Sequence, residues 1–355
     1  MRVVGGAGSS RSVGSLVPAD GRVLLVTTPG ATRRGTTHAI VEQLGAARVT
    51  VHDRVTPNPS LDDLDDATER LHGTAAQAIV AVGGGSALDS AKVLSVTLER
   101  GVERPLERAL RGGERQAWAS AVPVVAVPTT SGTGAEVTPF ATVWDTATHR
   151  KHSVAGEALH PAVAVLDPEL TLSLPAEETL VSGLDAISHA LESLWNRNRT
   201  AVSVAYARQA LALAGTALAA VRGDPSDLTE RARMQEAALL AGLAISQTRT
   251  AIAHSVSYPL TARFGVPHGL ACSFTLAELL KPNLDALVEL TGDPHVMEAI
   301  LELLGSLRLG ERVRRYASLE GILAWESEMR TPERLSNFSG RLDGGIPDLI
   351  ARSLA

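Results

Sequence analysis

One carboxylate and three imidazoles in the second half of the chain have the residue types and positions of candidate metal ligands. Asp185 and His189 stand four residues apart in the segment GLDAISHALES, which is predicted to be helical, so both side chains leave the same helix face. Further along, His254 begins another predicted helix, and His268 follows in the turn VPHG. These donors suit a borderline divalent ion such as Fe(II) or Zn(II).

An Asp and a His four residues apart belong to an ordinary polar helix face more often than to a metal site. The other histidines of the chain stand in loops or on polar faces, where no metal-binding role is predicted: His38, His52, His72, His149, His152, His160 and His295. The metal hypothesis therefore needs support from the rest of the sequence.

Two polar loops in the first half have the composition of phosphate-binding turns. The loop Gly83-Gly84-Gly85-Ser86 follows a predicted strand and precedes a predicted helix over 87–97. Glycines let an anion approach the backbone, and a helix N-terminus offers unpaired N–H groups. A second loop, PTTSGTG at 128–134, leaves the next predicted strand in the same way. One such loop is common in proteins without a nucleotide, but two at the same ends of parallel strands favour a bound dinucleotide.

The elements that position these loops alternate between short apolar runs and helices. Strands are predicted at 22–26, 46–51, 78–82 and 124–127, with a helix from about residue 30 to 44. Apolar, β-branched runs separated by helices predict a mostly parallel sheet that is covered on both faces. The first twenty residues, rich in Gly and Ser, are expected to form in part a loose edge hairpin.

The second half has a different periodicity. From about Glu177 onward the apolar residues recur at helical spacing, which predicts helices near 180–196, 200–221, 228–247, 250–261 and 270–290. The change falls in the segment DPELTLSLP, which is typical of a linker that ends in a helix cap. We therefore expect an α/β domain over residues 1–170 and an all-helical domain over residues 171–355.

Composition excludes several classes of protein. Hydrophobic residues make up 45% and charged residues 20% of the 355 residues, as in ordinary globular proteins. The single cysteine, Cys272, excludes an internal disulfide framework, and the net charge of −6 gives no general attraction to nucleic acid or anionic lipid. No apolar run has the length of a membrane span, and the N-terminus lacks a signal-peptide pattern. A cytoplasmic protein with no nucleic-acid or membrane partner is expected.

The combination of these segments resembles the iron-containing (group III metal-dependent) alcohol dehydrogenase family, whose relatives include glycerol dehydrogenase and dehydroquinate synthase. The resemblance extends from about residue 20 to 340. The matching segments are, in order, PNP at 57–59, GGGSALDSAK at 83–92, PTTSGTGAEVTPFATVWD at 128–145, GLDAISHALES at 183–193 and VPHG at 266–269. Their order and spacing agree with the family's pattern, and the C-terminal third is more divergent.

The resemblance implies a fold, a metal site, a cofactor site and an assembly. The fold would be a Rossmann-like α/β dinucleotide-binding domain followed by an all-helical domain, as in dehydroquinate synthase, and the protein would be a homodimer. The metal would be held by Asp185, His189, His254 and His268. The nicotinamide cofactor would lie against Thr28, Asn58, Gly84, Gly85, Ser86, Asp89, Thr129, Thr130, Thr133, Thr142 and Lys151.

Two positions depart from the family's pattern. Many NAD-preferring members carry an Asp after the first strand of this domain, where it binds the ribose 2′-hydroxyl, but this chain has Thr28 there, with Arg33 and Arg34 nearby. Without the carboxylate's repulsion of a 2′-phosphate, NADP(H), or weak discrimination from NAD(H), is expected. Many members also have a second His four residues after the third ligand, and here that position holds Tyr258. Tyr258 either relays a proton or forms a wall of the substrate pocket.

The expected chemistry is reversible hydride transfer between an alcohol carbon and the nicotinamide, with the alkoxide bound to the metal. The candidate catalytic residues are Tyr258, His254 and His268. The substrate is expected to be a polar alcohol, aldehyde or ketone of specialised metabolism, for example phosphonoacetaldehyde or a threonine-like alcohol on a modified peptide. Alternatives are a metal-independent maleylacetate reductase-like enzyme, a dehydroquinate synthase-like enzyme and a catalytically silent nucleotide-binding homologue.

Overall fold

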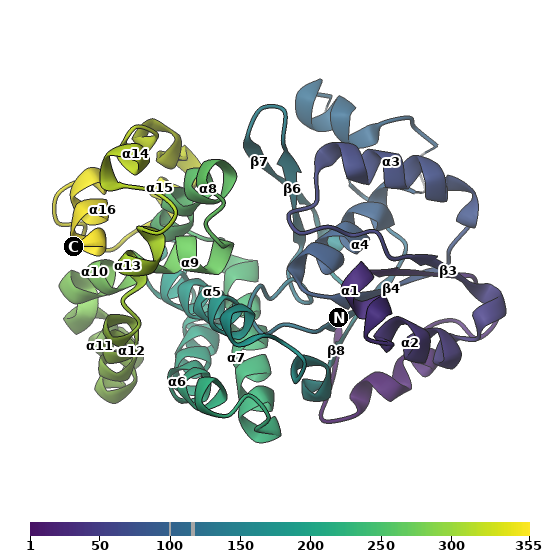
Figure 1. Ribbon diagram of the computed structural model, residues 1–355, viewed down its shortest axis with the longest axis horizontal. Coiled ribbons are helices and arrows are strands. Elements are labelled where there is room, and N and C mark those ends of the chain that lie inside the picture. The colour runs from purple at the N-terminus through teal and green to yellow at the C-terminus, as the bar shows by residue number, and fades with distance from the viewer. Residues whose placement is uncertain (99–100, 115–117) are drawn as a thin grey trace. The chain divides into compact units, whose positions relative to one another are not determined.

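The computed structural model describes residues 1–98, 101–114 and 118–355, and it divides into two units. The first unit comprises Met1–Thr130 and Ala135–Thr171, and the second comprises Ser131–Gly134 and Leu172–Ala355. In Figure 1 the first unit is coloured purple to blue and most of the second teal to yellow.

A parallel sheet of six strands forms the centre of the first unit, in the order β1-β8-β5-β4-β2-β3. Its strands are β1 (Arg2–Gly5), β2 (Val23–Thr27), β3 (Val49–His52), β4 (Ala78–Gly83), β5 (Val124–Pro128) and β8 (Val163–Leu166). All the pairings are parallel, which confirms the mostly parallel sheet predicted from the apolar runs. A separate antiparallel hairpin is formed by β6 (Phe140–Asp145) and β7 (Arg150–Ala155).

Helices cover both faces of the sheet, which explains why its central strands are apolar throughout. Alternate residues of a strand point to opposite faces. On one face, Leu24 and Ile79 pack with residues of α3 (Leu61–Leu71) and α4 (Gly85–Thr97). On the other face, Leu25 and Val80 pack with residues of α2 (Thr36–Leu44), which follows the short helix α1 (Pro29–Arg33).

The N-terminal segment differs from the hairpin expected there. Residues Arg2–Gly5 form an edge strand parallel to β8, and a 3-10 helix follows over Ser9–Leu16. The physical reason is Asp167, at the end of β8. Its carboxylate accepts hydrogen bonds from the backbone N–H of Gly8 at 3.0 Å and from the Ser10 hydroxyl at 2.6 Å, so it folds this segment back onto the sheet.

Two other predicted elements are shorter than expected. The strand predicted at 46–51 begins at Val49, because Ala46–Arg48 form a 3-10 turn after Gly45, whose φ is 83°. The helix predicted at 270–290 is divided into α9 (His268–Ser273), α10 (Leu276–Leu280) and α11 (Leu284–Thr291). A 3-10 turn containing Pro282 separates the last two, since proline lacks the N–H that a continuing helix requires.

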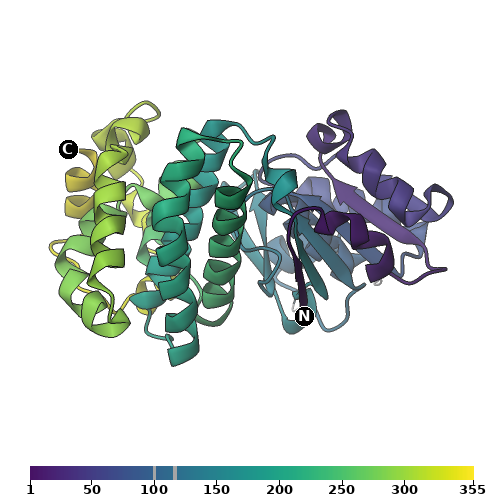
Figure 2. The same cartoon turned by 90° about the horizontal axis from the view of Figure 1, so that it is seen from below.

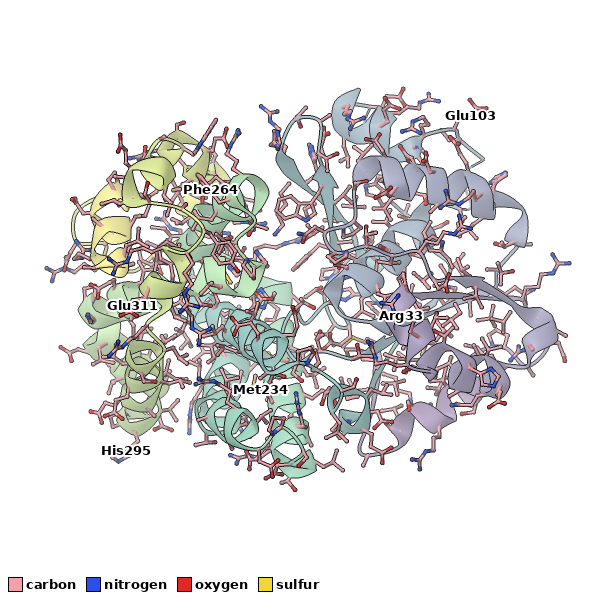
Figure 3. All side chains as sticks on the ribbon, viewed as in Figure 1. Arg33, Glu103, Met234, Phe264, His295 and Glu311 are labelled. Carbon is pink, nitrogen blue, oxygen red and sulfur yellow. The ribbon has the colours of Figure 1, made fainter. Side chains whose placement is uncertain are left out.

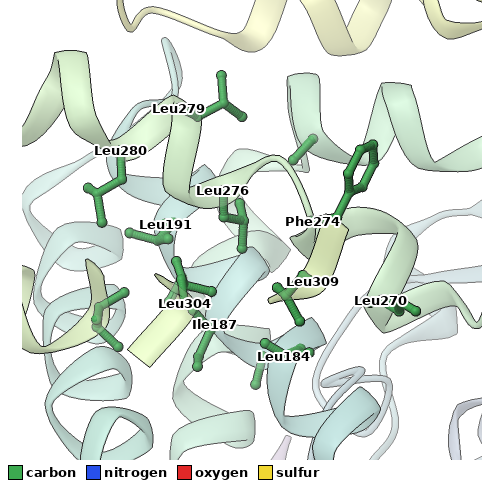
Figure 4. Close-up of a cluster of buried hydrophobic side chains, with 14 of the residues drawn as sticks. Leu184, Ile187, Leu191, Leu270, Phe274, Leu276, Leu279, Leu280, Leu304 and Leu309 are labelled. Carbon is green, nitrogen blue, oxygen red and sulfur yellow. The ribbon is translucent and has the colours of Figure 1, made fainter. Parts of the chain in front are cut away.

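Among its described residues, the second unit is built of helices. Its long helices α5 (Ala176–Leu194), α6 (Ala201–Gly223) and α7 (Leu228–Thr248) pack against one another and lie side by side in both views (Figures 1 and 2). The remaining helices are α8 (Ile252–Phe264), α12 (Pro294–Ser306), α13 (Leu309–Val313), α14 (Leu319–Leu323), α15 (Pro332–Asn337) and α16 (Ile346–Leu354). Leucines of α5, α9, α10, α12 and α13 meet in its core (Figure 4).

Helix α6 is long and apolar enough, by length and composition, to cross a membrane. Its Leu211, Ala214 and Leu218 are buried in the core of the second unit, and it packs against α5 and α7. This is the environment of a core helix.

Candidate active site

Helix α5 carries three ionisable side chains on one face. Asp185, His189 and Glu192 follow one another at helical spacing, and all three are buried. The opposite face of α5 places Leu184, Ile187 and Leu191 in the apolar core (Figure 4). The amphipathic pattern of α5 therefore fixes the rotation of the helix and, with it, the direction of the polar side chains.

The side chain of Glu192 caps the N-terminus of α8, although the two are about 60 residues apart in the sequence. The N-cap residue of α8, Ala251, has no side chain that could accept a hydrogen bond from the first turn. Instead, Glu192 Oε1 accepts hydrogen bonds from the backbone N–H groups of Ala253 at 2.7 Å and His254 at 3.2 Å. The other oxygen, Oε2, lies 2.5 Å from His254 Nδ1. Since an ionised carboxylate only accepts, Nδ1 carries the proton and Nε2 turns toward Asp185.

His268 is the first residue of helix α9. The helix can approach α5 only because Gly269 has no side chain, since a Cβ atom there would lie 1.9 Å from the carbonyl oxygen of Val181. The glycine of the VPHG turn is thus a packing requirement that brings His268 to the face of α5.

Of the four predicted metal ligands, the three histidines approach one carboxylate oxygen of the fourth, Asp185. Asp185 Oδ1 lies 3.5 Å from His189 Nε2, 3.6 Å from His254 Nε2 and 3.9 Å from His268 Nε2. The rings of His189 and His254 are stacked with centroids 4.9 Å apart, and those of His254 and His268 meet edge to face at 5.3 Å.

These donors fit a divalent ion. Ligand atoms about 2.1 Å from a tetrahedral ion lie roughly 3.4 Å from one another, close to the separations seen here. The nitrogen His254 Nε2 is buried and makes no hydrogen bond to any described residue, as expected of an atom reserved for a ligand. Neutral imidazoles and a carboxylate are the donors that Fe(II) and Zn(II) accept.

Cys272 is a further donor that the sequence analysis did not place here. Its Sγ lies 3.4 Å from Asp185 Oδ1, and Asp185, His254, His268 and Cys272 form a group whose donor atoms lie within 4.8 Å of one another. Burial, together with the charge of Asp185, raises the pKa of the thiol well above its usual value, so Cys272 keeps its proton and donates an S–H hydrogen bond to Asp185. Its position four residues after His268 on α9 was the available signal.

The carboxylates and imidazoles of the cluster each stabilise the charged form of the other. Burial alone would raise the pKa of Asp185, but the three imidazoles outweigh it and hold this pKa well below the usual range. Burial lowers the pKa of His254, yet Glu192 and Asp185 outweigh that effect and raise it to about 9 in the metal-free protein. A cation is therefore favoured at this position, whether a proton or a metal ion.

The two glycine-rich loops lie together at the carboxyl ends of β4 and β5. Thr129 donates its backbone N–H to the Gly83 carbonyl oxygen at 2.9 Å, and a Cβ atom on Gly84 would lie 3.1 Å from the side chain of Thr130. Asn58, with φ 55°, donates its backbone N–H to the Ser86 hydroxyl at 3.2 Å, and Gly85 begins α4. A backbone cradle at a helix N-terminus is thus present in the first unit.

The remaining predicted cofactor residues lie in three different settings. Asp89 accepts a hydrogen bond from the backbone N–H of Thr142 at 2.8 Å and pairs with the buried Lys92 at 3.4 Å, so it joins α4 to β6. Lys151 on β7 lies over the Trp144 ring, 5.8 Å from its centroid. Thr133 belongs to the segment Ser131–Gly134, which groups with the second unit.

Among the described residues, the donor group of Asp185, His254, His268 and Cys272 includes neither His189 nor any of the seven other histidines. His38, His72, His149 and His295 are exposed, and Figure 3 shows His295 at the margin of the second unit.

Tyr258 lies on α8 one turn after His254, and its hydroxyl accepts a hydrogen bond of 3.1 Å from Arg334 Nε. Arg334, on α15, was not among the predicted site residues. It lies in the divergent C-terminal third, where no motif marked it.

These features are a backbone cradle at a helix N-terminus in the first unit and a histidine–carboxylate cluster in the second, and comparison with known proteins identifies the class. Residues 1–168 match the model of the iron-containing alcohol dehydrogenase family, and residues 179–341 match that of the C-terminal region of the same family. The chain belongs to the iron-containing alcohol dehydrogenase family. It is an oxidoreductase that acts on alcohol or aldehyde groups with a nicotinamide cofactor.

Several individual relatives are similar over most of the chain. Phosphonoacetaldehyde reductase of Streptomyces viridochromogenes is 36% identical over 291 residues, which cover 79% of this chain and 73% of that one. Sulfoacetaldehyde reductase of Bilophila wadsworthia is 32% identical over 255 residues, 71% of this chain and 65% of that one. The crystal structure of sulfoacetaldehyde reductase from Bifidobacterium kashiwanohense in complex with NAD+ superposes with a TM-score of 0.87 at 25% identity, over 100% of this chain and 96% of that one.

Proposed function

We propose that the protein is a metal-dependent, NAD(P)H-linked reductase of small aldehydes that oxidises the corresponding alcohols in the reverse direction. The observation that carries this proposal is the convergence of three imidazole nitrogens on one oxygen of Asp185, at 3.5, 3.6 and 3.9 Å. A divalent ion held by Asp185, His189, His254 and His268 would supply the Lewis acidity that polarises the substrate oxygen. The aldehyde reductases among the relatives support this direction of reaction.

The chain's own residues have distinct parts in this proposal. Glu192 holds the His254 ring in the tautomer whose Nε2 faces the centre. Tyr258 accepts a hydrogen bond from Arg334, and a hydroxyl that accepts can still donate its own hydrogen to the substrate oxygen. The loops at Gly84 and Thr130 bind the pyrophosphate of the cofactor through backbone N–H groups at the start of α4.

Turnover with and without metal tests the proposal. Protein loaded anaerobically with Fe(II) or Zn(II) is expected to oxidise NADH or NADPH when propionaldehyde is added. The rate should fall to background after chelation and return when the ion is restored. Full activity after complete metal removal would instead indicate a metal-independent reductase, and no oxidation under any condition would indicate a silent homologue.

The cofactor preference is proposed to favour NADPH, because Thr28 stands where a carboxylate would repel a 2′-phosphate. Thr28 is the N-cap of α1, where its Oγ1 accepts the backbone N–H of Ala31 at 3.2 Å, and the exposed Arg33 lies on the same helix (Figure 3). Asp is an equally good N-cap, so Thr28→Asp should retain α1 while adding the repulsive charge.

Thr28→Asp is expected to lower kcat/KM for NADPH by about 10- to 100-fold relative to NADH, since a like-charge contact costs a few kcal/mol. Steady-state kinetics with both cofactors measure this ratio. Thr28→Asn, a neutral cap of the same shape, is the matched control and should leave the ratio close to that of the wild type. A Thr28→Asp ratio equal to that of Thr28→Asn would remove residue 28 from cofactor selection.

A further inference from the structure

Arg334 is a half-buried cation on α15 whose Nε contacts the Tyr258 hydroxyl, and the chemistry described so far gives it no role in the reaction. Its side chain is only 15% exposed. Burial lowers the pKa of its guanidinium, but Tyr258, Glu333 and Glu192 outweigh this and keep its pKa above the usual value, so the group is charged. A cation held in such a place is expected to have a specific anionic partner.

The helix that carries Arg334 is anchored at both ends. At its start, the backbone N–H of Thr331 donates to the Ser255 hydroxyl at 3.1 Å, which ties the helix to α8. At its end, the Asn337 side chain donates to the Thr250 carbonyl oxygen at 2.9 Å, just before α8 begins. Both anchors lie on or next to the helix that carries His254 and Tyr258. Arg334 is therefore held in a fixed relation to the metal centre.

The guanidinium of Arg334 has donor capacity that the protein does not use. Its Nε donates to Tyr258, but its buried Nη1 makes no hydrogen bond to any described residue. The carboxylate of Glu333, which is 68% exposed, lies 3.6 Å from Nη1, close enough for an ion pair but too far for a hydrogen bond. A guanidinium has a planar fork of N–H groups that matches an oxyanion, so a ligand oxygen at Nη1 would complete its hydrogen bonding.

Arg334 is linked to the metal ligand His254 through Tyr258, which lies one turn after His254 on α8. His254 and Tyr258 are four residues apart on α8, which places their Cβ atoms about 6 Å apart on one helix face. Arg334 contacts the Tyr258 hydroxyl, and the charge of Glu192, the partner of His254, acts on it. A molecule with its carbonyl at the His254 end and an anionic group at the Tyr258 end would need only a few bonds between them.

We propose that the substrate is a short aldehyde carrying a phosphonate or sulfonate group, and that Arg334 binds this group and determines specificity. This inference rests on the proposed function and names its substrate class. The relatives include reductases of phosphonoacetaldehyde and sulfoacetaldehyde. In each of these two substrates, two carbons separate the anionic group from the reacting oxygen. In the reduction, hydride from the nicotinamide reaches the carbonyl carbon and a proton reaches its oxygen, while the anionic group is unchanged.

Kinetics of the metal-loaded enzyme with phosphonoacetaldehyde, sulfoacetaldehyde and the neutral propionaldehyde test the proposal. We expect at least one of the two anionic aldehydes to have a kcat/KM about 10- to 100-fold above that of propionaldehyde, the range of a charge-assisted hydrogen-bond pair. The kcat/KM values for phosphonoacetaldehyde and sulfoacetaldehyde show whether the dianionic phosphonate or the monoanionic sulfonate is preferred.

Arg334→Gln should lower the ratio of kcat/KM between the preferred anionic aldehyde and propionaldehyde by about 10- to 100-fold, with most of the change in KM. The ratio is unaffected by a general loss of active protein. Arg334→Lys keeps the charge without the planar fork and should give an intermediate ratio. Arg330→Gln is the matched control, because Arg330 lies four residues away, is 54% exposed and pairs with Glu326.

Each outcome separates this inference from the proposed function. Turnover of propionaldehyde with no preference for either anionic aldehyde overturns this inference alone. If the wild type prefers an anionic aldehyde and the ratio of kcat/KM to propionaldehyde is the same in Arg334→Gln as in Arg330→Gln, the role of Arg334 is overturned. Absence of nicotinamide oxidation with every aldehyde overturns the proposed function and this inference together.

Discussion

Asp185→Asn is expected to reduce aldehyde reduction by about a thousandfold or more. Asp185 provides the oxygen on which His189, His254 and His268 converge, and it supplies the negative charge that a divalent ion requires. Asn has nearly the same shape, so the helix should be retained, but the charge is lost. Lewis-acid stabilisation is worth several kcal/mol, which corresponds to a factor of this size.

The measurement for Asp185→Asn is the steady-state rate after metal loading, compared with that of Asp227→Asn. Asp227 is the N-cap of α7 in the same unit, and Asn caps helices as well as Asp does. The control should therefore retain the wild-type rate. Full turnover by metal-loaded Asp185→Asn would show that the carboxylate has no part in the reaction.

Glu192→Gln is expected to weaken metal binding by about 10- to 100-fold, the usual effect of removing a partner that orients a ligand. Both oxygens of Glu192 face donors: Oε1 faces two backbone N–H groups of α8, and Oε2 faces His254 Nδ1. A glutamine must therefore turn its NH₂ group toward a donor in either orientation. The imidazole can relieve this conflict by moving its proton to Nε2, which then cannot bind a metal.

A competition titration with a chelator measures the metal dissociation constant of Glu192→Gln. Glu178→Gln is the control, because Glu178 lies on the same helix and is exposed. Rates measured at saturating metal separate a loss of affinity from a loss of folding. An unchanged dissociation constant in Glu192→Gln would contradict the assigned orientation of His254.

The sheet could be predicted because its signals are local, whereas the set of four donors was assigned from the resemblance to a known family. Continuous apolar runs such as Val23–Thr27 indicate strands buried on both faces, and an Asp and a His four residues apart indicate a shared helix face. The edge strand β1 was missed, because its pairing with β8 and its link to Asp167 join residues more than 150 positions apart.

The partners of the donors could not be predicted, because they depend on how the helices pack. Glu192 was visible in the same motif as Asp185, but nothing in the sequence shows that the start of α8 meets its carboxylate. Cys272 seemed informative only about disulfides, although it lies against Asp185. Arg334 comes from a short helix 76 residues after its partner Tyr258, in a segment without a motif.

Metal content tests the central claim most directly. Elemental analysis of wild-type protein purified without chelator, with Asp185→Asn prepared in parallel, is expected to find about one Fe or Zn per wild-type chain and only traces in the variant. A wild-type protein that remains metal-free after anaerobic loading with Fe(II) and with Zn(II), or a variant that retains the same stoichiometry, would contradict the account.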